Sequence, residues 1–366
     1  MIKLRELILS ELRQIETYLE GDCSKVAGHN GLYYDQETPV RNLSHWLFLL
    51  SELKLRPDDF QIELEYVVNL KQKILDCLLK EEFRPLNQAF WVRKNPKKDF
   101  CNGTIGQAWV IEALVRASKA FAEPYLYKIA EDLFSKHPFY EDLSVWGRLN
   151  VEGTYNTPDP VFNHQLWMAA AASQLYKTDH ARQRASLFLD NVASNVKLYH
   201  DGIICHLSPV MKMPKESSDK RLKVEAVLNY IFYLLSKKDQ KKKSAGYHAF
   251  NLYAFSILHE SFPNHPLWTT QKFRQMIHVT RSEQFKKLNM KNPYSYPYNP
   301  TGIEMAFVLE TFVPNSNLEI SDWLKRQLSE THIPNNSIMI RQSEDEMTSR
   351  ARIYEATRLR QDYSLS

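Results

Sequence analysis

The sequence predicts an all-α protein folded as an (α/α)6 toroid, a six-hairpin barrel with short β pieces in its loops. Helical periods dominate the 366 residues, and no comparable set of alternating strand patterns appears. Some predicted helices are apolar nearly all round and others have a clear polar face, as two concentric helical layers require. Glycine is scarce, with 10 residues, whereas Rossmann, P-loop and β-propeller folds need more of it for phosphate turns and tight hairpins.

Helices are expected along the whole chain. We predict them near residues 2–20, 42–53, 60–80, 104–121, 124–136, 161–176, 179–196, 220–236, 245–261, 266–279, 302–313 and 319–331. Helices 104–121 and 161–176 are apolar on every side and are expected in the buried layer, whereas 60–80 and 179–196 are amphipathic. Short extended pieces are expected at residues 88–93, 199–207 and 337–342.

The toroid is expected to occupy residues 1–335 as a single domain. Residues 336–366 are expected to form a C-terminal extension that packs on the toroid or is partly flexible. Two other all-α architectures compete with this fold. An α-solenoid would show a tighter period of roughly 34–47 residues, and a large helix bundle would show longer heptad runs.

Several predicted buried helices begin after a polar loop that contains proline or glycine. These loops and first turns are TPVRNLSHW (38–46), DFCNGTIGQAW (99–109), TPDPVFNHQLW (157–167), SAGYHAFNLY (244–253) and YPYNPTGIE (296–304). Such similar helix starts imply that the loops before them lie together at one end of the toroid. Because loops gathered on a rigid scaffold are where sites are usually built, we expect a site at that end.

Charge and composition argue against several functions. The net charge is +4, from 47 Lys and Arg against 43 Asp and Glu. Neither a basic stripe nor an RNP-like aromatic motif appears, so no nucleic-acid partner is expected. The lysine run at 237–243 is interpreted as a solvated loop between helices. No stretch of about 18 apolar residues occurs, so no membrane span is expected.

The N-terminus and the cysteines favour a cytoplasmic protein. Residues 1–20 have a helical amphipathic period and charges throughout, unlike a signal peptide. The four cysteines are widely spaced and form no CxxC pair, so neither a zinc ribbon nor a disulfide framework is indicated. No HExxH or GxSxG motif occurs. We expect no metal and no cofactor, and a homodimer is compatible with the sequence.

The most specific segment is CNGTIGQAW at 101–109. Asn102 is expected to cap the helix start and Gly103 to relieve the backbone there. Gln107 and Trp109 would project from the first turns. One interpretation is a capped core helix with tight packing. The other, which two glycines in a glycine-poor chain favour, places Asn102, Gln107 and Trp109 in a substrate-binding site.

The segment YNTPDPVFNHQ, which begins at Tyr155, contains the next candidates. Pro160 suits a first helical position, and Asp159 would cap that helix. His164 and Gln165 follow on an otherwise apolar helix, either as core residues with satisfied hydrogen bonds or as part of the site.

Two other helix starts offer polar side chains. His248 and Asn251 lie about one turn apart on one face of a helix, either as a hydrogen-bonded core pair or as substrate contacts. The helix start at 38–46 contributes Arg41, His45 and Trp46 as further candidates for substrate binding.

The loop at 292–304 is the richest in candidate residues. Its prolines make it stiff, and its tyrosines display rings and phenol hydroxyls. Tyr296, Tyr298 and Asn299 are expected to face the site. Glu304 would lie in the first helical turn, where the helix dipole favours a carboxylate. The alternative is a capping glutamate in a loop that packs on the barrel.

The segments CNGTIGQAWVIEALVRAS, VFNHQLWMAAAASQLY and GYHAFNLYAF resemble helix starts of glucuronyl C5-epimerase-type toroid proteins. The wider relatives with this layout are six-hairpin sugar enzymes, namely N-acylglucosamine 2-epimerases, unsaturated glucuronyl hydrolases and related lyases. The combination of CNGxIGQAW with PYNPTGIE is also similar to proteins encoded in surface-glycan clusters.

The resemblance implies sugar chemistry in a cavity at one end of the toroid. In such epimerases and lyases, tyrosine and carboxylate groups exchange the proton at C5 of a uronate. Here the matching chemical types are Tyr155, Tyr296, Tyr298 and Glu304.

The leading hypothesis is a carbohydrate-active enzyme that acts on a uronic-acid-containing glycan or oligosaccharide by proton abstraction, as an epimerase or lyase-like enzyme. This chemistry needs a base, an acid on the opposite face and charge neutralisation. We assign Glu304 or His164 as the base, Tyr298 as the acid, and Asn102 and Gln107 as neutralising or positioning donors.

Two alternatives stay open. A glycoside hydrolase would use two carboxylates, for example Asp159 and Glu304. A non-catalytic glycan-binding protein on the same fold would stack sugars on aromatic rings. The candidate rings are Trp46, Trp91, Trp109, Trp146 and Trp167.

Overall fold

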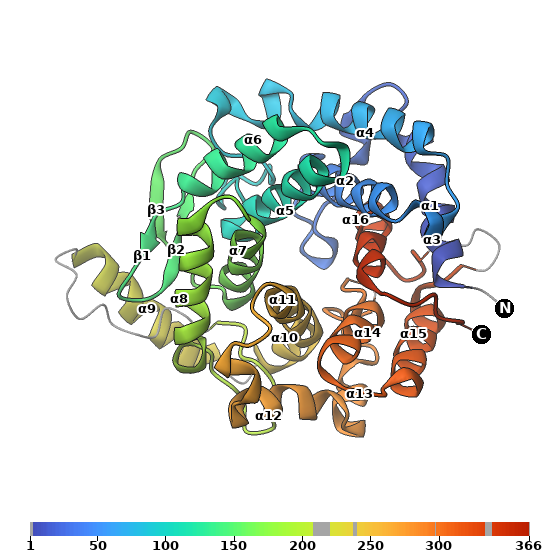
Figure 1. Cartoon of the computed structure of the whole chain (residues 1–366). Helices are drawn as coiled ribbons and strands as arrows, with labels where there is room; N and C mark the ends of the chain where they lie inside the picture. Colours follow the sequence, from blue (N-terminus) through green and yellow to red (C-terminus); the bar gives the residue numbers. More distant parts are fainter. Residues whose placement is uncertain (1–2, 208–219, 237–239, 297, 334–338, 366) are drawn as a thin grey trace.

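A computed structural model of the chain describes residues 3–207, 220–236, 240–296, 298–333 and 339–365. Over these residues the chain is mostly helical, as the sequence predicts, and its strands are few and short. The helices lie in two layers around a common centre (Figure 1). Within the same ranges, no helix has both the length and the apolar character needed to cross a membrane.

The inner layer consists of helices that are buried on nearly every side. They are α2 (Val40–Leu55), α5 (Gly103–Phe121), α7 (Phe162–Gln174), α11 (His248–Ser261) and α14 (Thr301–Phe312). Each packs on the next in this order. The 3-10 helix η7 (Arg352–Arg358) packs on both α14 and α2 and so closes the ring. A helix that is apolar on every side needs cover on every side, and the ring provides it.

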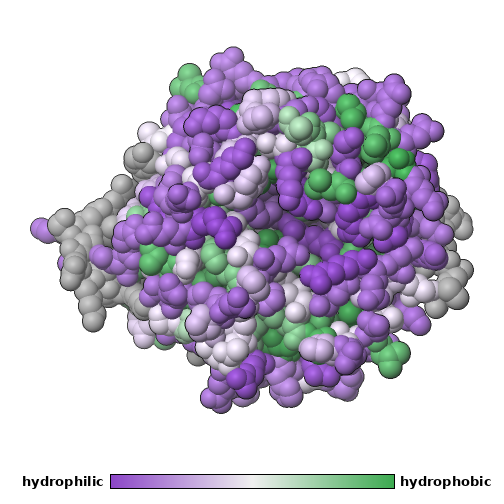
Figure 2. Space-filling view, in the orientation of Figure 1, coloured by the Kyte–Doolittle hydropathy of each residue, from purple (hydrophilic) through white to green (hydrophobic). Residues whose placement is uncertain are grey.

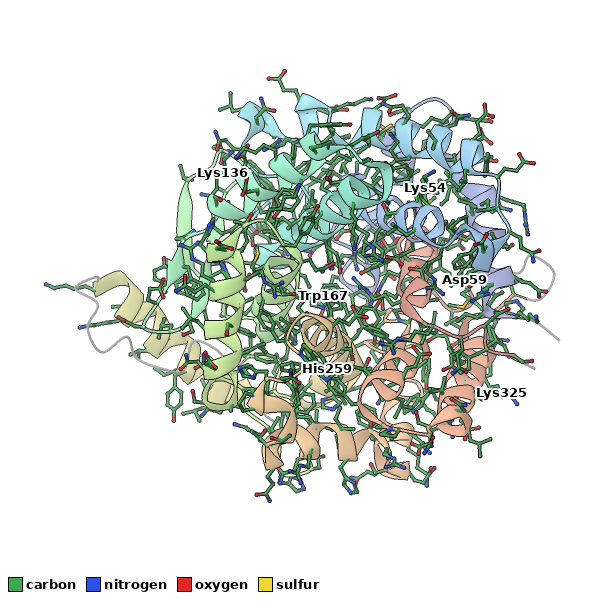
Figure 3. All side chains as sticks on the ribbon, viewed as in Figure 1. Lys54, Asp59, Lys136, Trp167, His259 and Lys325 are labelled. Carbon is green, nitrogen blue, oxygen red and sulfur yellow. The ribbon has the colours of Figure 1, made fainter. Side chains whose placement is uncertain are left out.

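The outer layer consists of amphipathic helices, each of which covers one inner element. They are α1 (Leu4–Leu19), α4 (Leu64–Leu78), α6 (Pro124–Ser135), α8 (Asp179–Asn195), α12 (Gln271–Thr280) and α15 (Asn317–Thr331). In that order they pack on η7, α2, α5, α7, α11 and α14. Lys136, which follows α6, and Lys325 of α15 lie toward the outside, whereas Trp167 of α7 lies in the inner layer (Figure 3).

The C-terminal segment takes part in the ring. The short helix α16 (Glu346–Ala351) packs on α2, and η7 follows it directly. Arg352 pairs with Glu304 of α14 at 2.8 Å, and Arg358 pairs with Glu112 of α5. This segment therefore supplies part of the inner wall, and a domain boundary at residue 335 stays a prediction.

Some helix boundaries differ from the prediction. The helix predicted at 60–80 is broken before α4, because Gln61 adopts a left-handed backbone with φ of 50°. The helix predicted at 245–261 is interrupted at Tyr247. The other α-helices of the described residues are α3 (Pro57–Phe60), α9 (Lys220–Ser236), α10 (Gln240–Gly246) and α13 (Glu283–Asn289).

The antiparallel sheet lies where the sequence predicted no strand. Its strands are β1 (Phe139–Tyr140), β2 (Val145–Leu149) and β3 (Tyr155–Pro158), with β2 in the middle. Strands this short give too little alternation to be seen in the sequence. The pieces predicted at 88–93 and 199–207 make only isolated bridges, and the piece at 337–342 lies partly outside the described residues.

Candidate functional site

A cavity of ≈ 210 Å³ lies where the inner helices begin. Every inner element contributes to it from its first turns or from the loop before it. Helix starts provide Arg41, Asn102, His164, Tyr247 and Arg352. The face of the molecule drawn in Figure 2 is hollowed near the centre of the ring, and hydrophilic side chains surround the hollow.

The residues predicted for the site fall into two groups. Those that line the cavity are Arg41, Asn102, Trp109, His164, Tyr298 and Asn299. Those that are buried and do not line it are His45, Trp46, Gln107, Asp159, Gln165, His248, Asn251, Tyr296 and Glu304. Tyr155 belongs to β3, and its side chain lies outside the described part of the structure.

His164, which lines the cavity, forms a hydrogen-bonded pair with Asp159 behind it. His164 Nδ1 lies 2.8 Å from Asp159 Oδ2. Asp159 also accepts from the backbone N–H of Thr104 at 2.9 Å. Burial alone would raise the pKa of Asp159, but His164 and the Thr104 bond outweigh it and hold the pKa below its usual value. Asp159 is therefore an ionised acceptor, so Nδ1 of His164 carries the proton and Nε2 is the basic nitrogen left for a ligand.

The start of α5 leaves room for this pair. Asn102 and Gly103 both have left-handed backbones, with φ of 57° and 63°. The Asn102 side chain does not cap α5, contrary to the prediction, because Asp159 accepts the Thr104 N–H instead. A Cβ atom on Gly103 would lie 2.2 Å from Asp159 Oδ2 and 2.4 Å from His164 Nδ1, so only glycine fits here.

A row of phenol hydroxyls forms another part of the wall. Tyr33 Oη lies 3.4 Å from Tyr247 Oη, which donates to Tyr298 Oη at 3.2 Å. The Tyr298 hydroxyl in turn donates to Asn30 Oδ1 at 2.7 Å. Burial raises the pKa of Tyr298 above its usual value, so this hydroxyl is protonated at neutral pH and is able to give a proton to a ligand.

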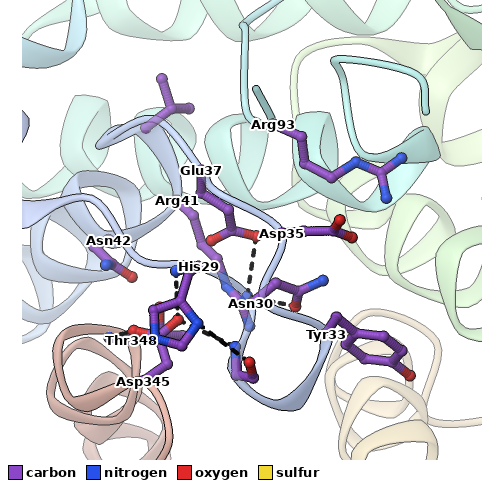
Figure 4. A network of polar contacts seen from close by, with 12 residues as sticks. His29, Asn30, Tyr33, Asp35, Glu37, Arg41, Asn42, Arg93, Asp345 and Thr348 are labelled. Atoms are coloured by element: carbon purple, nitrogen blue, oxygen red, sulfur yellow. Dashed lines mark hydrogen bonds and ion pairs between the residues drawn. The ribbon is translucent and has the colours of Figure 1, made fainter. Parts of the chain in front are cut away.

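The loop before α2 brings Asn30, and the first turn of α2 brings Arg41, to the same wall (Figure 4). Asn30 Oδ1 accepts from Arg41 Nη1 at 3.3 Å, and Arg41 pairs with Glu37 at 3.4 Å. The guanidinium of Arg41 lies 4.5 Å from the ring centre of Trp109. Asp345 holds the loop from the C-terminal side by accepting backbone N–H bonds from it. The position of Arg41 is therefore fixed by groups on several elements.

Glu304 lies behind the wall in a buried ion-pair cluster. Arg352, which lines the cavity, pairs with Glu304 at 2.8 Å and with Glu355 at 2.6 Å. Burial, together with the neighbouring Glu355, raises the pKa of Glu304 well above its usual value. Both carboxyl groups therefore hold Arg352 in place, and neither residue lines the cavity.

His206 and Lys243 also line the cavity, although the sequence analysis assigned neither to the site. The backbone N–H of His206 donates to Ser244 Oγ at 3.0 Å, which brings His206 next to the residue that follows Lys243. Burial lowers the pKa of His206 well below its usual value, so the ring is neutral at pH 7. The extended piece predicted at 199–207 was the only feature of the sequence that pointed to His206. Nothing in the sequence pointed to Lys243, because it ends a lysine run typical of a solvated loop.

Two side-chain amides that were predicted to bind substrate instead form hydrogen bonds with backbone groups of neighbouring segments. Gln107 accepts from Phe90 N at 2.8 Å and donates to Phe90 O at 2.9 Å. Gln165 does the same with Trp146, at 2.8 Å and 2.7 Å. Because a buried amide must find partners, a structural glutamine of this kind cannot be distinguished from a binding one in the sequence.

Two predicted histidines contact other parts of the protein and do not line the cavity. His248 Nδ1 accepts from Ile204 N at 3.1 Å, and its Nε2 lies 2.9 Å from Met276 O. The His45 ring stacks on Tyr354, with 4.4 Å between the ring centres. These contacts connect helix starts to neighbouring elements and leave the two rings away from the cavity.

The cavity offers little to the two alternative hypotheses. Among the described residues that line it, Asp35 is the only carboxylate, and it binds Lys98 and Asn95. Trp109 is likewise the only tryptophan in that set. The other candidate rings are buried or half-buried elsewhere, and they are Trp46, Trp91, Trp146 and Trp167.

Cationic side chains dominate the charged groups of the wall. They are Arg41, Arg93, Lys98, Lys243 and Arg352. Wherever the structure describes the chain, no group of three or more His, Cys, Asp and Glu side chains is arranged to hold a metal ion. The arrangement therefore suits an anionic ligand, with an imidazole and phenol hydroxyls available for proton transfer.

The chain has a relative that matches it from end to end. It is 37% identical over 374 residues to archaeal glycosylation protein Q of Haloferax volcanii, and the alignment covers 100% of this chain and 99% of that protein. The chain belongs to the family of archaeal glycosylation protein Q. A scan against general protein-family models gave no match.

This member of the archaeal glycosylation protein Q family shares its fold with a sugar epimerase. Its structure matches that of cellobiose 2-epimerase from Bacillus thermoamylovorans B4167 with a TM-score of 0.61. The match covers 96% of this chain and 98% of the epimerase, at 11% sequence identity. At so low an identity the likeness shows the fold alone.

Proposed function

We propose that this chain is a carbohydrate-active enzyme with an (α/α)6-toroid fold that moves a proton on a sugar ring, as an epimerase or lyase-like enzyme. Its proposed substrate is a uronic-acid-containing glycan or oligosaccharide. The observation that carries the proposal is that His164, which lines a cationic cavity, is hydrogen-bonded to Asp159. The names of the similar proteins, a glycosylation protein and a cellobiose 2-epimerase, support a sugar as the substrate.

In the proposed reaction His164 is the base. Its Nε2 takes the proton from the ring carbon that carries the carboxylate, and the electron pair of that C–H bond moves into the carboxylate. Asp159 stabilises the imidazolium that forms. In an epimerase, an acid returns a proton to the same carbon from the other face. In a lyase, the electron pair instead expels the glycosidic oxygen from the neighbouring carbon.

Tyr298 is the proposed acid, because its hydroxyl is protonated and connected to a row of further hydroxyls. Arg41 and Asn102 line the same cavity and are the proposed donors to the negative charge that develops. Glu304 is the weaker candidate for the base, since Arg352 holds it behind the wall. The two-carboxylate hydrolase has less support, because Asp159 is bound to His164 and does not line the cavity.

The test is product analysis by proton NMR with methyl glycosides of glucuronic and galacturonic acid, and with the same glycosides that carry a second sugar on O4. The glycosidic oxygen at C4 is the leaving group that a lyase needs. The wild-type chain is expected to produce either the C5 epimer or an unsaturated product. His164→Asn is expected to reduce the rate by about 10²–10⁴-fold, the usual contribution of a general base. The matched control is His200→Asn, an exposed histidine outside the cavity, which should leave the rate unchanged. Hydrolysis of the glycoside by both variants at the wild-type rate would overturn the proposal.

A further inference from the structure

Lys243 differs from the other cations of the cavity in having no acidic partner among the residues that the structure describes. The others each pair with a carboxylate: Arg41 with Glu37, Arg93 with Asp99, Lys98 with Asp35, and Arg352 with Glu304 and Glu355. Lys243 Nζ makes neither an ion pair nor a hydrogen bond with any residue that the structure describes. A partly buried ammonium group without a counter-ion is costly unless a ligand supplies one.

Aromatic rings surround the ammonium group of Lys243. Nζ lies 5.2 Å from the ring centre of Tyr33 and 5.9 Å from those of Tyr247 and Tyr294. The faces of such rings attract a cation, but they leave its N–H donors free for a ligand. The rings therefore fix the position of a charge whose hydrogen-bonding capacity is unused.

Lys243 lies in the same cavity as the groups proposed to transfer the proton. The residue after it, Ser244, accepts the backbone N–H of His206. His206 and His164 line the same cavity as Lys243. An anionic group bound to Nζ would therefore bring the atoms next to it toward the imidazoles. Neutralising a carboxylate also makes the adjacent C–H bond easier to deprotonate, because the electron pair moves into that carboxylate.

We propose that Lys243 binds the carboxylate of a sugar acid and thereby selects uronate over neutral sugars; this inference rests on the proposed function. A carboxylate fits better than a phosphate because, in the part of the chain that the structure describes, Lys243 is the one cation of the cavity without a carboxylate partner. Phosphate sites usually present several donors or a bidentate arginine, whereas the arginines and the other lysine of this cavity already have carboxylate partners.

The experiment is titration calorimetry at pH 7 with three probes: methyl β-D-glucuronide, methyl β-D-glucoside and inorganic phosphate. Lys243→Gln is expected to weaken glucuronide binding about 10–100-fold, the usual size of a charge-assisted hydrogen bond, and to leave glucoside binding unchanged. Lys242→Gln, which changes the exposed neighbouring lysine, should bind all probes as the wild type does. Lys243→Arg should recover part of the glucuronide affinity, and thermal unfolding checks that each variant is folded.

A pH series gives a second readout. Burial, with Lys98 nearby, lowers the pKa of Lys243 to about 8. The wild-type affinity for the glucuronide should therefore fall as the pH rises from 7 to 9, and that of Lys243→Gln should not. The other groups that face Lys243 are Tyr33, Tyr247, Tyr294, Lys98 and His206. Because these groups are present in both proteins, the difference between the two pH series isolates Lys243.

Several results would overturn the inference. They are equal loss of glucuronide and glucoside affinity in Lys243→Gln, no loss of either, tighter binding of phosphate than of glucuronide, or no glucuronide binding by the wild type. Turnover of neutral sugars with loss of the ring proton, and no preference for the glucuronide, would overturn this inference and leave proton transfer standing. Glucuronide binding through Lys243 that is followed only by hydrolysis would support this inference and overturn the proposed proton transfer.

Discussion

His164 and His248 have similar positions in the sequence but different environments in the fold. Both lie in the first turns of inner helices. One ring nitrogen of His164 is hydrogen-bonded to Asp159, and the residue lines the cavity. Both ring nitrogens of His248 are hydrogen-bonded to backbone groups, of Ile204 and Met276. The sequence could place both histidines at helix starts. It could not separate them, because the partners of His248 come from distant segments.

The buried His248 gives a prediction for stability. Burial lowers its pKa to about 4, below the value of about 6.5 expected in the unfolded chain. The unfolded state therefore takes up the proton first, so stability that is fully present above pH 6.5 is lost as the pH falls from 6.5 to 4. The loss from this residue reaches about 3 kcal/mol at most.

His248→Gln should remove this part of the pH dependence. Urea unfolding of the wild type and the variant between pH 4 and pH 7 measures it, with the exposed His200→Gln as the control. Identical pH slopes in the wild type and His248→Gln would show that protonation of this ring does not limit stability in acid.

At the scale of secondary structure, the start of α5 connects a local sequence signal to the chemistry of the site. The scarce glycines correctly marked this helix start as unusual. The expected cap was wrong, however, since Asp159 of another helix start takes the role of the Asn102 side chain. Which carboxylate meets a free N–H depends on tertiary packing, and no spacing rule within one segment encodes it.

Gly103→Ala is predicted to disrupt the Asp159–His164 pair. The new Cβ would lie within 2.4 Å of both side chains, and alanine would also be strained at φ of 63°. The strain alone costs about 1–2 kcal/mol, and displacement of His164 should abolish turnover.

Gly21→Ala is the matched control for this variant. Gly21 has φ of 84°, but nothing lies within 4 Å of the position of its Cβ. The Gly21→Ala variant should therefore lose about as much stability as Gly103→Ala and keep its activity. The comparison needs the unfolding free energy and the turnover rate of both variants, and full activity in Gly103→Ala would show that the close approach has no role.

For the whole molecule, the ring is closed by residues that the sequence analysis set apart as an extension. Periodicity predicted most of the inner and outer helices, because long buried or amphipathic helices carry a strong signal. It missed η7, since seven residues of 3-10 helix have no such period. The sequence predicted only that a site lies where the loops before the inner helices come together. The roles of the cations Lys243 and Arg352 were not predictable, because they depend on which carboxylates lie beside them.

Removal of residues 346–366 should prevent cooperative folding. The truncation would leave Glu304 and Glu112 buried without Arg352 and Arg358, and breaking a buried ion pair in this way costs about 3–5 kcal/mol. Thermal unfolding by circular dichroism should show a broad transition or none. A synthetic peptide of residues 346–366, added in trans, should restore part of it. A sharp transition at the wild-type temperature in the truncated chain would show that the ring does not need this segment.

Isotope exchange in D₂O tests the central claim, proton transfer on a sugar ring, most directly. The products of the wild-type reactions with methyl glucuronide and with its 4-O-glycosylated form, which carries the leaving group that a lyase needs, are analysed by proton NMR and mass spectrometry. The account predicts deuterium at the ring carbon that bears the carboxylate, or loss of that hydrogen in an unsaturated product, and neither with His164→Asn. A product of glycosidic cleavage that keeps its original ring hydrogen, formed equally fast by His164→Asn, would contradict the account.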